Sequence, residues 1–337
     1  MSAKLPTALP DRYLFAFEGD GGIWLEMHRQ AYRDSIFLDA RIVPASETST
    51  IVPLANMPAP SPALPCGWIF HIAHCGSTLL ARALDRPSGG VVLREPFTLR
   101  QLGIEAATSR GGDWQQRLQL ATALLGRRYD QAQMSIVKAN VPVNFIIPDV
   151  LEVALGAPAI FLHHGLADYL GAILRSPNHR NWLRGITTDL ALAITAHAGA
   201  VPDDDAGRAA ALWLAQLRCQ MTALTTIPGG RSLDAETLFR MPDAVLAAAG
   251  ELFGQRASDA EIASITSGAL FATYSKNPAF AFDNVARLAR QNALSVTLYP
   301  EISRARAWVA DRLADFPLPS RLPHPLVADP LARDLLD

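Results

Sequence analysis

Lysine is scarce in this chain of 337 residues. Of its 30 lysine and arginine residues only three are lysines, Lys4, Lys138 and Lys276, and the remaining 27 are arginines. A coding bias toward arginine accounts for this ratio. The scarcity is still informative, because a motif that needs a lysine away from the N-terminus has only Lys138 and Lys276 to supply it.

Other absences exclude several classes of protein. The net charge is −2 and charged residues make up 18% of the chain, so no domain-wide basic excess indicates a nucleic-acid partner. Three cysteines form no disulfide framework in a chain of this length, which favours a reducing compartment. Residues 1–13 lack the apolar core of a signal peptide, and no run reaches the ~18 apolar residues of a membrane span. We therefore expect a cytoplasmic protein without a membrane partner.

Half of the residues are hydrophobic, which is enough for a substantial core. Aromatic and β-branched runs at 12–17, 22–28 and 34–43 predict three strands, with a Gly-rich turn after the first. The segment 44–65 is rich in Pro, Ser and Thr and is interpreted as a connection. We predict a small N-terminal β unit with its linker over residues 1–60.

From residue 61 onward short apolar strands alternate with helices. The predicted strands are 68–73, 91–96, 135–139, 159–164 and 231–235. The predicted helices begin at 77 and continue at 114–129, 144–155, 166–175, 181–198, 206–226, 242–254, 259–270, 283–292 and 300–314. This alternation is typical of an α/β fold with a parallel sheet covered on both faces, and it predicts one domain over 61–337.

The strongest local signal is the segment 68–84, WIFHIAHCGSTLLARAL. A strand, a tight glycine turn, Ser-Thr and a helix follow one another. In that order the N–H groups of Gly76, Ser77 and Thr78 face an anion at the helix N-terminus. The alternative is that Ser77 and Thr78 simply cap the helix. The GxxxxGK[ST] pattern is absent, because no lysine precedes Ser77, and this disfavours a simple ATP hydrolase.

Five segments together resemble the sulfotransferases, and bacterial members in particular. AHCGSTLL (73–80) is similar to their 5′-phosphosulfate loop, VVLREPFTL (91–99) to their acceptor-side Glu-Pro segment, and FLHHGLADYLGAILR (161–175) to their 3′-phosphate region. SLDAETLFRMPDAVLAAAGELFG (232–254) and ATYSKNPAFAFD (272–283) match later segments in order. The resemblance covers about 66–292. It implies a three-layer P-loop fold and transfer of a sulfuryl group from 3′-phosphoadenylyl sulfate to a small acceptor.

The chain departs from this family at charged positions. His74 stands where the loop has Lys or Arg, and Cys75 where it has Ser. In the 3′-phosphate region His164 replaces Arg and Ala172 replaces Ser, while Asp168 fits the pattern. These changes remove a charge-assisted donor and a hydroxyl, so a 3′-phosphate would be held more weakly or by other residues.

The resemblance implies roles for individual residues. Cys75, Gly76, Ser77, Thr78, His164, Asp168 and Lys276 would bind the donor. His74 would lie at the bridging oxygen, either protonated or as a hydrogen-bond donor; the alternative is a solvated loop histidine. Glu95 ends a strand and is a candidate base, or else it pairs with Arg94 or Arg100.

Lys138 ends an otherwise apolar strand, so we expect it to have a partner, either a ligand anion or Glu95. We count it among the catalytic candidates. Lys276 lies on a loop, where a lysine is usually solvated. The polar segment 178–184 is either a lid that supplies arginines to the donor or an ordinary helix start.

The histidines and Cys75 also suggest a metal site as an alternative. His71, His74, His163 and His164 could converge with Cys75 on Zn²⁺ if their strands are neighbours. Their spacing matches no metal signature, and strand alternation sends His163 and His164 to opposite faces. We therefore expect no metal. Two alternatives to a sulfotransferase stay open: another P-loop transferase such as a small-molecule kinase, and an inactive nucleotide- or anion-binding protein. The acceptor and the oligomeric state stay open as well.

Overall fold

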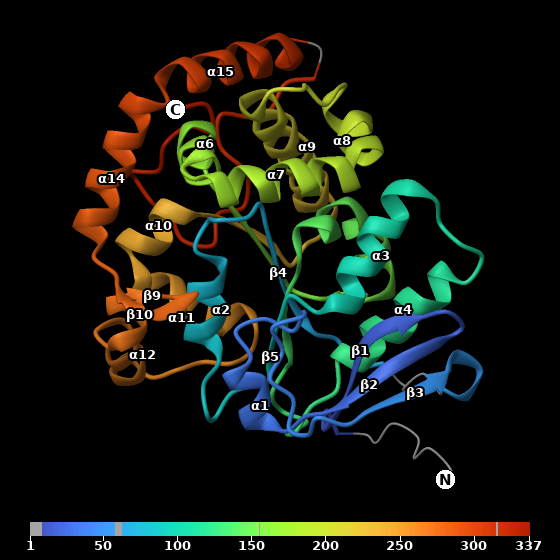
Figure 1. Ribbon diagram of the computed structural model, residues 1–337. Helices are drawn as coiled ribbons and strands as arrows, with labels where there is room; N and C mark the ends of the chain where they lie inside the picture. Colours follow the sequence, from blue (N-terminus) through green and yellow to red (C-terminus); the bar gives the residue numbers. More distant parts are fainter. Residues whose placement is uncertain (1–8, 58–62, 155, 315) are drawn as a thin grey trace.

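The computed structural model describes residues 9–57, 63–154, 156–314 and 316–337. Its first element is an antiparallel sheet in the order β1-β2-β3 (Figure 1). The strands are β1 (Arg12–Glu18), β2 (Gly21–Glu26) and β3 (Ser49–Pro53). Gly19 adopts φ +57° in the turn between β1 and β2, a conformation that glycine reaches without a steric cost. The predicted N-terminal β sheet is confirmed.

The third strand was predicted at 34–43, and that prediction is wrong. The chain there forms the short helix α1 (Arg29–Asp34) and then an irregular segment, while β3 lies in the stretch interpreted as a connection. Phe37 and Leu38 are buried for another reason. The Leu38 N–H donates to the Arg94 carbonyl and the Leu38 carbonyl accepts from the Phe97 N–H, so this segment lines the end of the parallel sheet instead of extending the antiparallel one.

The centre of the molecule is a parallel sheet of five strands in the order β5-β6-β4-β7-β8. The strands are β4 (Gly67–His71), β5 (Val92–Arg94), β6 (Ile136–Lys138), β7 (Ala159–His163) and β8 (Gly230–Asp234). Every residue of β4 and β7 is buried, as expected for strands covered on both faces. The predicted α/β class with a central parallel sheet is confirmed.

Helices and short elements make up the rest. They are η1 (Leu54–Asn56), α2 (Ser77–Leu84), α3 (Phe97–Thr108), α4 (Trp114–Leu125), η2 (Val141–Ile146), α5 (Ile147–Val153), α6 (Leu166–Leu174), α7 (Pro177–Asp189), α8 (Ala191–Ala198), α9 (Asp205–Thr226), α10 (Ala235–Arg240), α11 (Pro242–Leu252), α12 (Asp259–Thr266), α13 (Ala269–Ala272), β9 (Thr273–Tyr274), β10 (Asn277–Ala281), α14 (Asn284–Thr297) and α15 (Tyr299–Leu313). No helix in these ranges is both long and apolar enough to cross a membrane.

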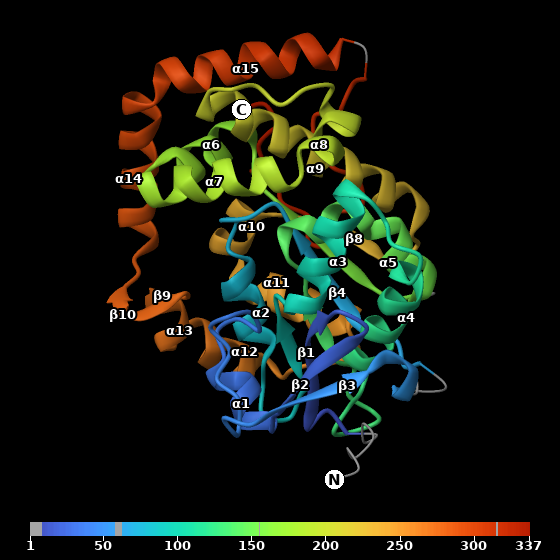
Figure 2. The ribbon, with the colours of Figure 1, turned by 45° about the vertical axis from the view of Figure 1, so that its right-hand side comes forward.

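The helices form layers around the parallel sheet. Figure 2 shows α2, α11 and α12 on one side of the sheet and α3, α4 and α5 on the other. Helix α9, whose side chains are mostly buried, packs against β7 and β8 and carries α6, α7, α8 and α15 on its surface. The carboxyl ends of all five strands are left at one edge of the sheet. In a parallel α/β fold ligands bind at that edge, beside the strand where the order reverses, which here is β4.

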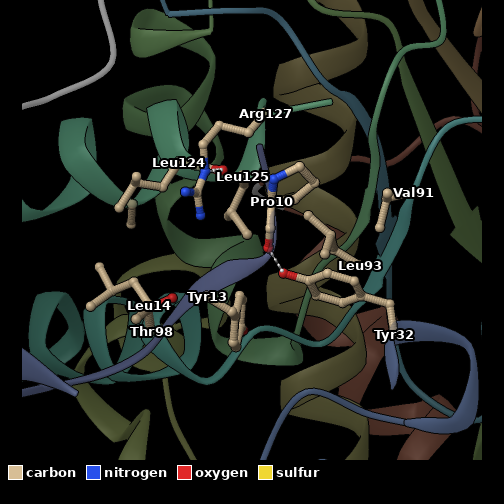
Figure 3. Close-up of a pocket in the computed structure, with 11 residues that line it drawn as sticks. Pro10, Tyr13, Leu14, Tyr32, Val91, Leu93, Thr98, Leu124, Leu125 and Arg127 are labelled. Carbon is tan, nitrogen blue, oxygen red and sulfur yellow. Dashed lines mark hydrogen bonds between the residues drawn. The ribbon is translucent and has the colours of Figure 1, made fainter. Parts of the chain in front are cut away.

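The N-terminal sheet is joined closely to the rest. Gln101 of α3 accepts from the Phe17 N–H and donates to the Phe17 carbonyl, as a neighbouring strand would. A cavity of about 10 Å³ lies at this junction, where the Tyr32 hydroxyl donates to the Pro10 carbonyl (Figure 3). A space of that size holds about one water molecule, so it reflects packing and is not a nucleotide site.

The C-terminal segment runs along the edge strand β8. The Ser232 N–H donates to the His324 carbonyl and the Leu326 N–H donates to the Ser232 carbonyl. Farther on, the Leu166 N–H at the start of α6 donates to the Leu335 carbonyl. The segment therefore covers a sheet edge that would otherwise be open to pairing.

Candidate functional site

The loop between β4 and α2 has a strained backbone. Ala73, His74 and Gly76 have φ of +74°, +51° and +79°, in the left-handed region that non-glycine residues rarely adopt. Each non-glycine residue held there costs of order 1–3 kcal/mol, and such strain is concentrated at functional loops. At Gly76 a Cβ atom would also lie 3.1 Å from Leu238 Cδ2, a tight contact that adds to the preference for glycine at this φ.

The N-terminus of helix α2 has no side-chain cap among the described residues. Its N-cap residue is Gly76, and its first turn contains no acidic residue. The positive end of the helix dipole and the N–H groups of Ser77 and Thr78 are therefore available to an anion. Thr78 is 2% exposed, and its hydroxyl has no hydrogen-bond partner among the described residues. A buried hydroxyl in that condition needs an explanation, and a bound anion supplies one.

Glu95, Lys138 and His71 form a buried network beside this loop. Lys138, at the end of β6, is fully buried and its ammonium contacts Oε1 of Glu95. The same nitrogen lies 3.0 Å from Nε2 of His71, and His71 Nε2 lies 3.8 Å from Glu95 Oε1. Of the partners considered from the sequence, Lys138 has Glu95, whereas Arg94 pairs with Asp85. Glu95 itself has φ +57°, so its position is strained as well.

Hydrogen bonding fixes which ring nitrogen of neutral His71 carries the proton. The Ala73 N–H donates to Nδ1 of His71, which leaves the proton of the neutral ring on Nε2. That N–H faces Lys138, and the two groups fit without opposing donors when the lysine nitrogen carries a lone pair. Burial lowers the pKa of Lys138 despite the nearby carboxylate. Burial, followed by the charge of Lys138, lowers the pKa of His71 well below its usual range. Burial therefore shifts the pKa of both groups toward the uncharged form.

The second lysine of the described chain reaches the same place. Lys276 lies in the turn between β9 and β10, and its ammonium lies 6.0 Å from the centre of the Phe37 ring, which Lys138 approaches at 5.4 Å. The charge of Lys276 contributes to the lowered pKa of His71, His74 and Lys138. The fold therefore brings together Glu95 and both lysines, although 181 residues separate Glu95 from Lys276 along the chain.

His74 is half-buried and packs against helix α7. Its ring centre lies 4.7 Å from that of His179 and 5.7 Å from that of Trp182. Burial, and after it the charge of Lys276, lowers the pKa of His74 well below its usual range. At neutral pH the ring is therefore uncharged in the ligand-free protein, and it can act as a hydrogen-bond donor. The interpretation of His74 as a standing cation is disfavoured.

The polar residues in and just before helix α7 fall into two groups, one at the site and one in contact with neighbouring helices. Arg175, at the end of α6, lies 2.9 Å from His179 Nε2 and 3.2 Å from the Tyr274 hydroxyl. Burial lowers the pKa of His179 to about 4. Arg180 instead pairs with Glu301 and Asp205, and Arg184 pairs with Asp205. The arginines in 178–184 therefore fasten α7 to its neighbours, and Arg175 and His179 face the loop.

The residues predicted for the 3′-phosphate lie next to the loop. His164, after β7, has Nε2 3.3 Å from the His74 carbonyl. Asp168, in the first turn of α6, lies 3.7 Å from Arg333 and lines a groove of about 580 Å³. A groove of that volume is within the range of small-molecule sites. It runs between α6, α14, α15 and the C-terminal segment. Cys75, in contrast, is fully buried, and its Sγ donates to the Leu162 carbonyl at 3.7 Å, so its side chain is not available to a ligand.

Several residues of this site did not emerge from sequence reasoning. They are Phe37, His71 as the partner of Lys138, Arg175, Tyr274 and Glu236 near His164. His71 gave a signal that was available, because a histidine interrupts the apolar run 68–73. Phe37, Arg175 and Glu236 sit in ordinary local patterns, and only the tertiary structure brings them to the sheet edge.

No family model matches the chain, and no curated protein matches it. Solved structures that overlap with it include a sulfotransferase domain from the curacin biosynthetic pathway (14% identity, TM-score 0.41, 73% of this chain and 98% of that one). Others are a sulfotransferase domain from the Synechococcus PCC 7002 olefin synthase (17%, 0.39, 72% and 98%) and a sulfotransferase from Alicyclobacillus acidocaldarius (12%, 0.36, 74% and 96%).

All three structures are sulfotransferases, the family that the sequence motifs resemble. Identities of 12–17% and TM-scores of 0.36–0.41 describe a partial overlap of elements. The activity of this chain therefore has to be argued from its own residues.

Proposed function

We propose that this protein transfers a sulfuryl group from an adenylyl sulfate donor to a hydroxyl or amine group of a small acceptor. One observation carries the proposal: the uncapped N-terminus of α2, with the unpartnered hydroxyl of Thr78, faces the same sheet edge as both described lysines and Glu95. An anion cradle, cations and a carboxylate in one place are what sulfuryl transfer needs, because its demands parallel those of phosphoryl transfer.

The donor's 5′-phosphosulfate would be held by the main chain of Gly76 and the N–H and hydroxyl groups of Ser77 and Thr78. Lys276 would neutralise its charge from the opposite side. His74 would donate a hydrogen bond to the bridging oxygen, and the approach of an anion raises the pKa of its ring and strengthens that bond. The groove beside Asp168 would hold the rest of the nucleotide.

Glu95 would accept the proton of the acceptor group. Its contacts to Lys138 and His71 use Oε1, so Oε2 is left for the acceptor. Lys138 and His71 would orient this carboxylate through their contacts with Oε1.

A thermal-shift panel tests the donor. We expect 3′-phosphoadenosine 5′-phosphate and adenosine 5′-phosphosulfate to stabilise the protein, since a ligand at 100 times its dissociation constant adds about 2.7 kcal/mol. Magnesium ATP is included to test the alternative that the protein is a kinase. Transfer to a mixed acceptor library is then measured for the wild type and Glu95→Gln, and we expect the variant to bind donor normally but to lose turnover. No stabilisation by either sulfur-pathway nucleotide would refute the proposal, and magnesium-dependent ATP turnover would favour a kinase.

A further inference from the structure

A second cluster of polar side chains lies at the carboxyl ends of β7 and β8. His164 follows β7, Asp168 is in the first turn of α6, and Glu236 is in the first turn of α10 after β8. One nitrogen or oxygen atom from each of the three lies within 4.8 Å of the other two. Among the described residues this is the only group of three histidine, cysteine or acidic side chains that meet so closely.

His164 has an unsatisfied nitrogen in this cluster. The residue is 4% exposed, and its Nε2 lies 3.3 Å from the His74 carbonyl. A carbonyl oxygen only accepts, so in the neutral ring Nε2 carries the proton and Nδ1 carries the lone pair. Nδ1 has no hydrogen-bond partner among the described residues. A buried lone pair beside two carboxylates is unfavourable unless a cation lies between them.

An arginine lies close to each of the two carboxylates. Arg287 of α14 contacts both oxygens of Glu236, at 2.6 and 2.7 Å, and Arg333 lies 3.7 Å from Asp168. Neither arginine satisfies Nδ1 of His164. A metal-binding histidine usually donates its second ring N–H to a backbone carbonyl, and metal-binding carboxylates are themselves hydrogen-bonded. Both features of such a site are present here.

We propose that His164 Nδ1, Asp168 and Glu236 bind a divalent first-row transition-metal ion, of the Zn²⁺ or Mn²⁺ kind. One imidazole nitrogen with two carboxylates favours these ions over Ca²⁺ and Mg²⁺, which take oxygen ligands. Asp168 lines the 580 Å³ groove, which gives the ion a route from solvent. The two guanidinium groups offset the two carboxylates, so the charge of the ion remains to attract an anion from the groove.

The site differs from the metal cluster considered from the sequence. There Cys75, His71 and His74 were candidates, but Cys75 donates to a carbonyl, His71 is engaged by Lys138 and the His74 ring packs on His179. Only His164 is shared between the two sets. Glu236 completes the new one because β8 lies next to β7 in the sheet, which no spacing in the sequence reveals.

Binding of Zn²⁺ and Co²⁺ to the full, nucleotide-free chain tests the proposal by calorimetry and by the Co²⁺ absorption spectrum. We expect one ion per chain and a rise in melting temperature. His164→Ala, Asp168→Asn and Glu236→Gln should each weaken binding more than about 100-fold, beyond the 10–100-fold typical for loss of an outer partner. His197→Ala and Asp149→Asn, which alter a histidine and a surface carboxylate elsewhere, should bind like the wild type.

A wild type that binds no ion, or three variants that bind as the wild type does, would overturn the metal site. Circular dichroism checks that each variant is folded, and the two amide variants keep the shape of the side chain if His164→Ala does not fold. Because the nucleotide is absent, this outcome is independent of whether the protein proves to be a sulfotransferase.

Discussion

A substitution at Thr78 should change ligand affinity and protein stability in opposite directions. Its buried hydroxyl has no partner among the described residues, so Thr78→Val removes an uncompensated polar group and should raise the free energy of unfolding by about 1 kcal/mol. The same change should weaken binding of 3′-phosphoadenosine 5′-phosphate, because one donor to its 5′-phosphate is lost. Urea unfolding and calorimetry measure the two effects.

Thr122→Val is the matched control for this exchange. Thr122 is 5% exposed in α4 and its hydroxyl is also unpartnered among the described residues, but it lies away from the loop. It should give a similar gain in stability with unchanged affinity. If Thr78→Val left affinity unchanged as well, the hydroxyl would have no part in binding.

Buried histidines make the stability depend on pH. Burial lowers the pKa of His71 and His74 well below the ordinary value, so below about pH 6.5 the unfolded chain binds protons that the folded chain does not. Stability is therefore complete above pH 6.5 and falls as the pH drops toward the folded-state pKa, by up to about 1.4 kcal/mol per pH unit for each histidine.

His71→Asn should make that decline shallower by about one proton, measured as the free energy of urea unfolding at pH 7.5, 6.0 and 5.0. His324→Asn is the control, because His324 is exposed. Identical slopes for the wild type and His71→Asn would show that His71 is protonated in the folded protein.

At single residues the sequence supports part of the site. The expectation that a lysine ending a buried strand has a partner is confirmed by the contact of Lys138 with Glu95. The donor roles of Gly76, Ser77, Thr78 and Lys276 stay predictions. His71 was visible as a histidine in an apolar strand, yet its partner follows only from the pairing of β4 with β6.

Among the elements, α6 and α7 separate two kinds of arginine. Arg175 contacts His179 and Tyr274 at the site, whereas Arg180 contacts Glu301 and Asp205 on α15 and α9. Arg175→Met should weaken nucleotide binding about tenfold, the equivalent of one lost contact of ~1.4 kcal/mol, with little change in stability. Arg180→Met should cost up to about 1 kcal/mol of stability and leave affinity unchanged.

Calorimetry with 3′-phosphoadenosine 5′-phosphate and urea unfolding distinguish these effects. The two variants are matched, since each removes one partly buried guanidinium from neighbouring turns of the chain. A loss of affinity in Arg180→Met would mean that α7 does act as a lid over the donor.

Element prediction succeeded where the local pattern decides structure. The five strands β4 to β8 lie within about two residues of their predicted ranges. Strands β4 to β7 are short, mainly apolar runs, which is the local pattern of a buried strand. The helix predicted at 181–198 is two helices, since α7 ends at Asp189 and α8 begins at Ala191. The predictions for residues 34–43 and 49–53 were wrong. The segment with Phe37 and Leu38 is buried because it contacts β5, and periodicity in the sequence does not show such a tertiary contact.

For the whole molecule, Arg94 fastens the N-terminal segment to the parallel sheet. It is 1% exposed, pairs with Asp85 at 2.8 Å, and donates to the carbonyls of Tyr32 and Ser35. Arg94→Met leaves Asp85 and these carbonyls without their main donor. We expect it to cost about 3–5 kcal/mol, as for other broken buried pairs. Urea unfolding of the wild type should show one transition, because the two parts share this contact.

Arg110→Met is the control for Arg94, since Arg110 forms an exposed pair with Asp149 and should cost less than about 1 kcal/mol. Two separate transitions in the wild type, or a cost for Arg94→Met no larger than that for Arg110→Met, would show that the N-terminal unit folds on its own.

The convergence of both described lysines on one sheet edge has a consequence for labelling chemistry. Outside the N-terminal residues, which include Lys4, an amine-selective ester has only Lys138 and Lys276 to modify. Lys138 is 0% exposed and in contact with Glu95, while Lys276 is partly exposed. The extent of acylation at Lys276, measured by peptide mass spectrometry, therefore reports whether an anion covers the site. The extent of acylation at Lys4 corrects for differences in the amount of reagent.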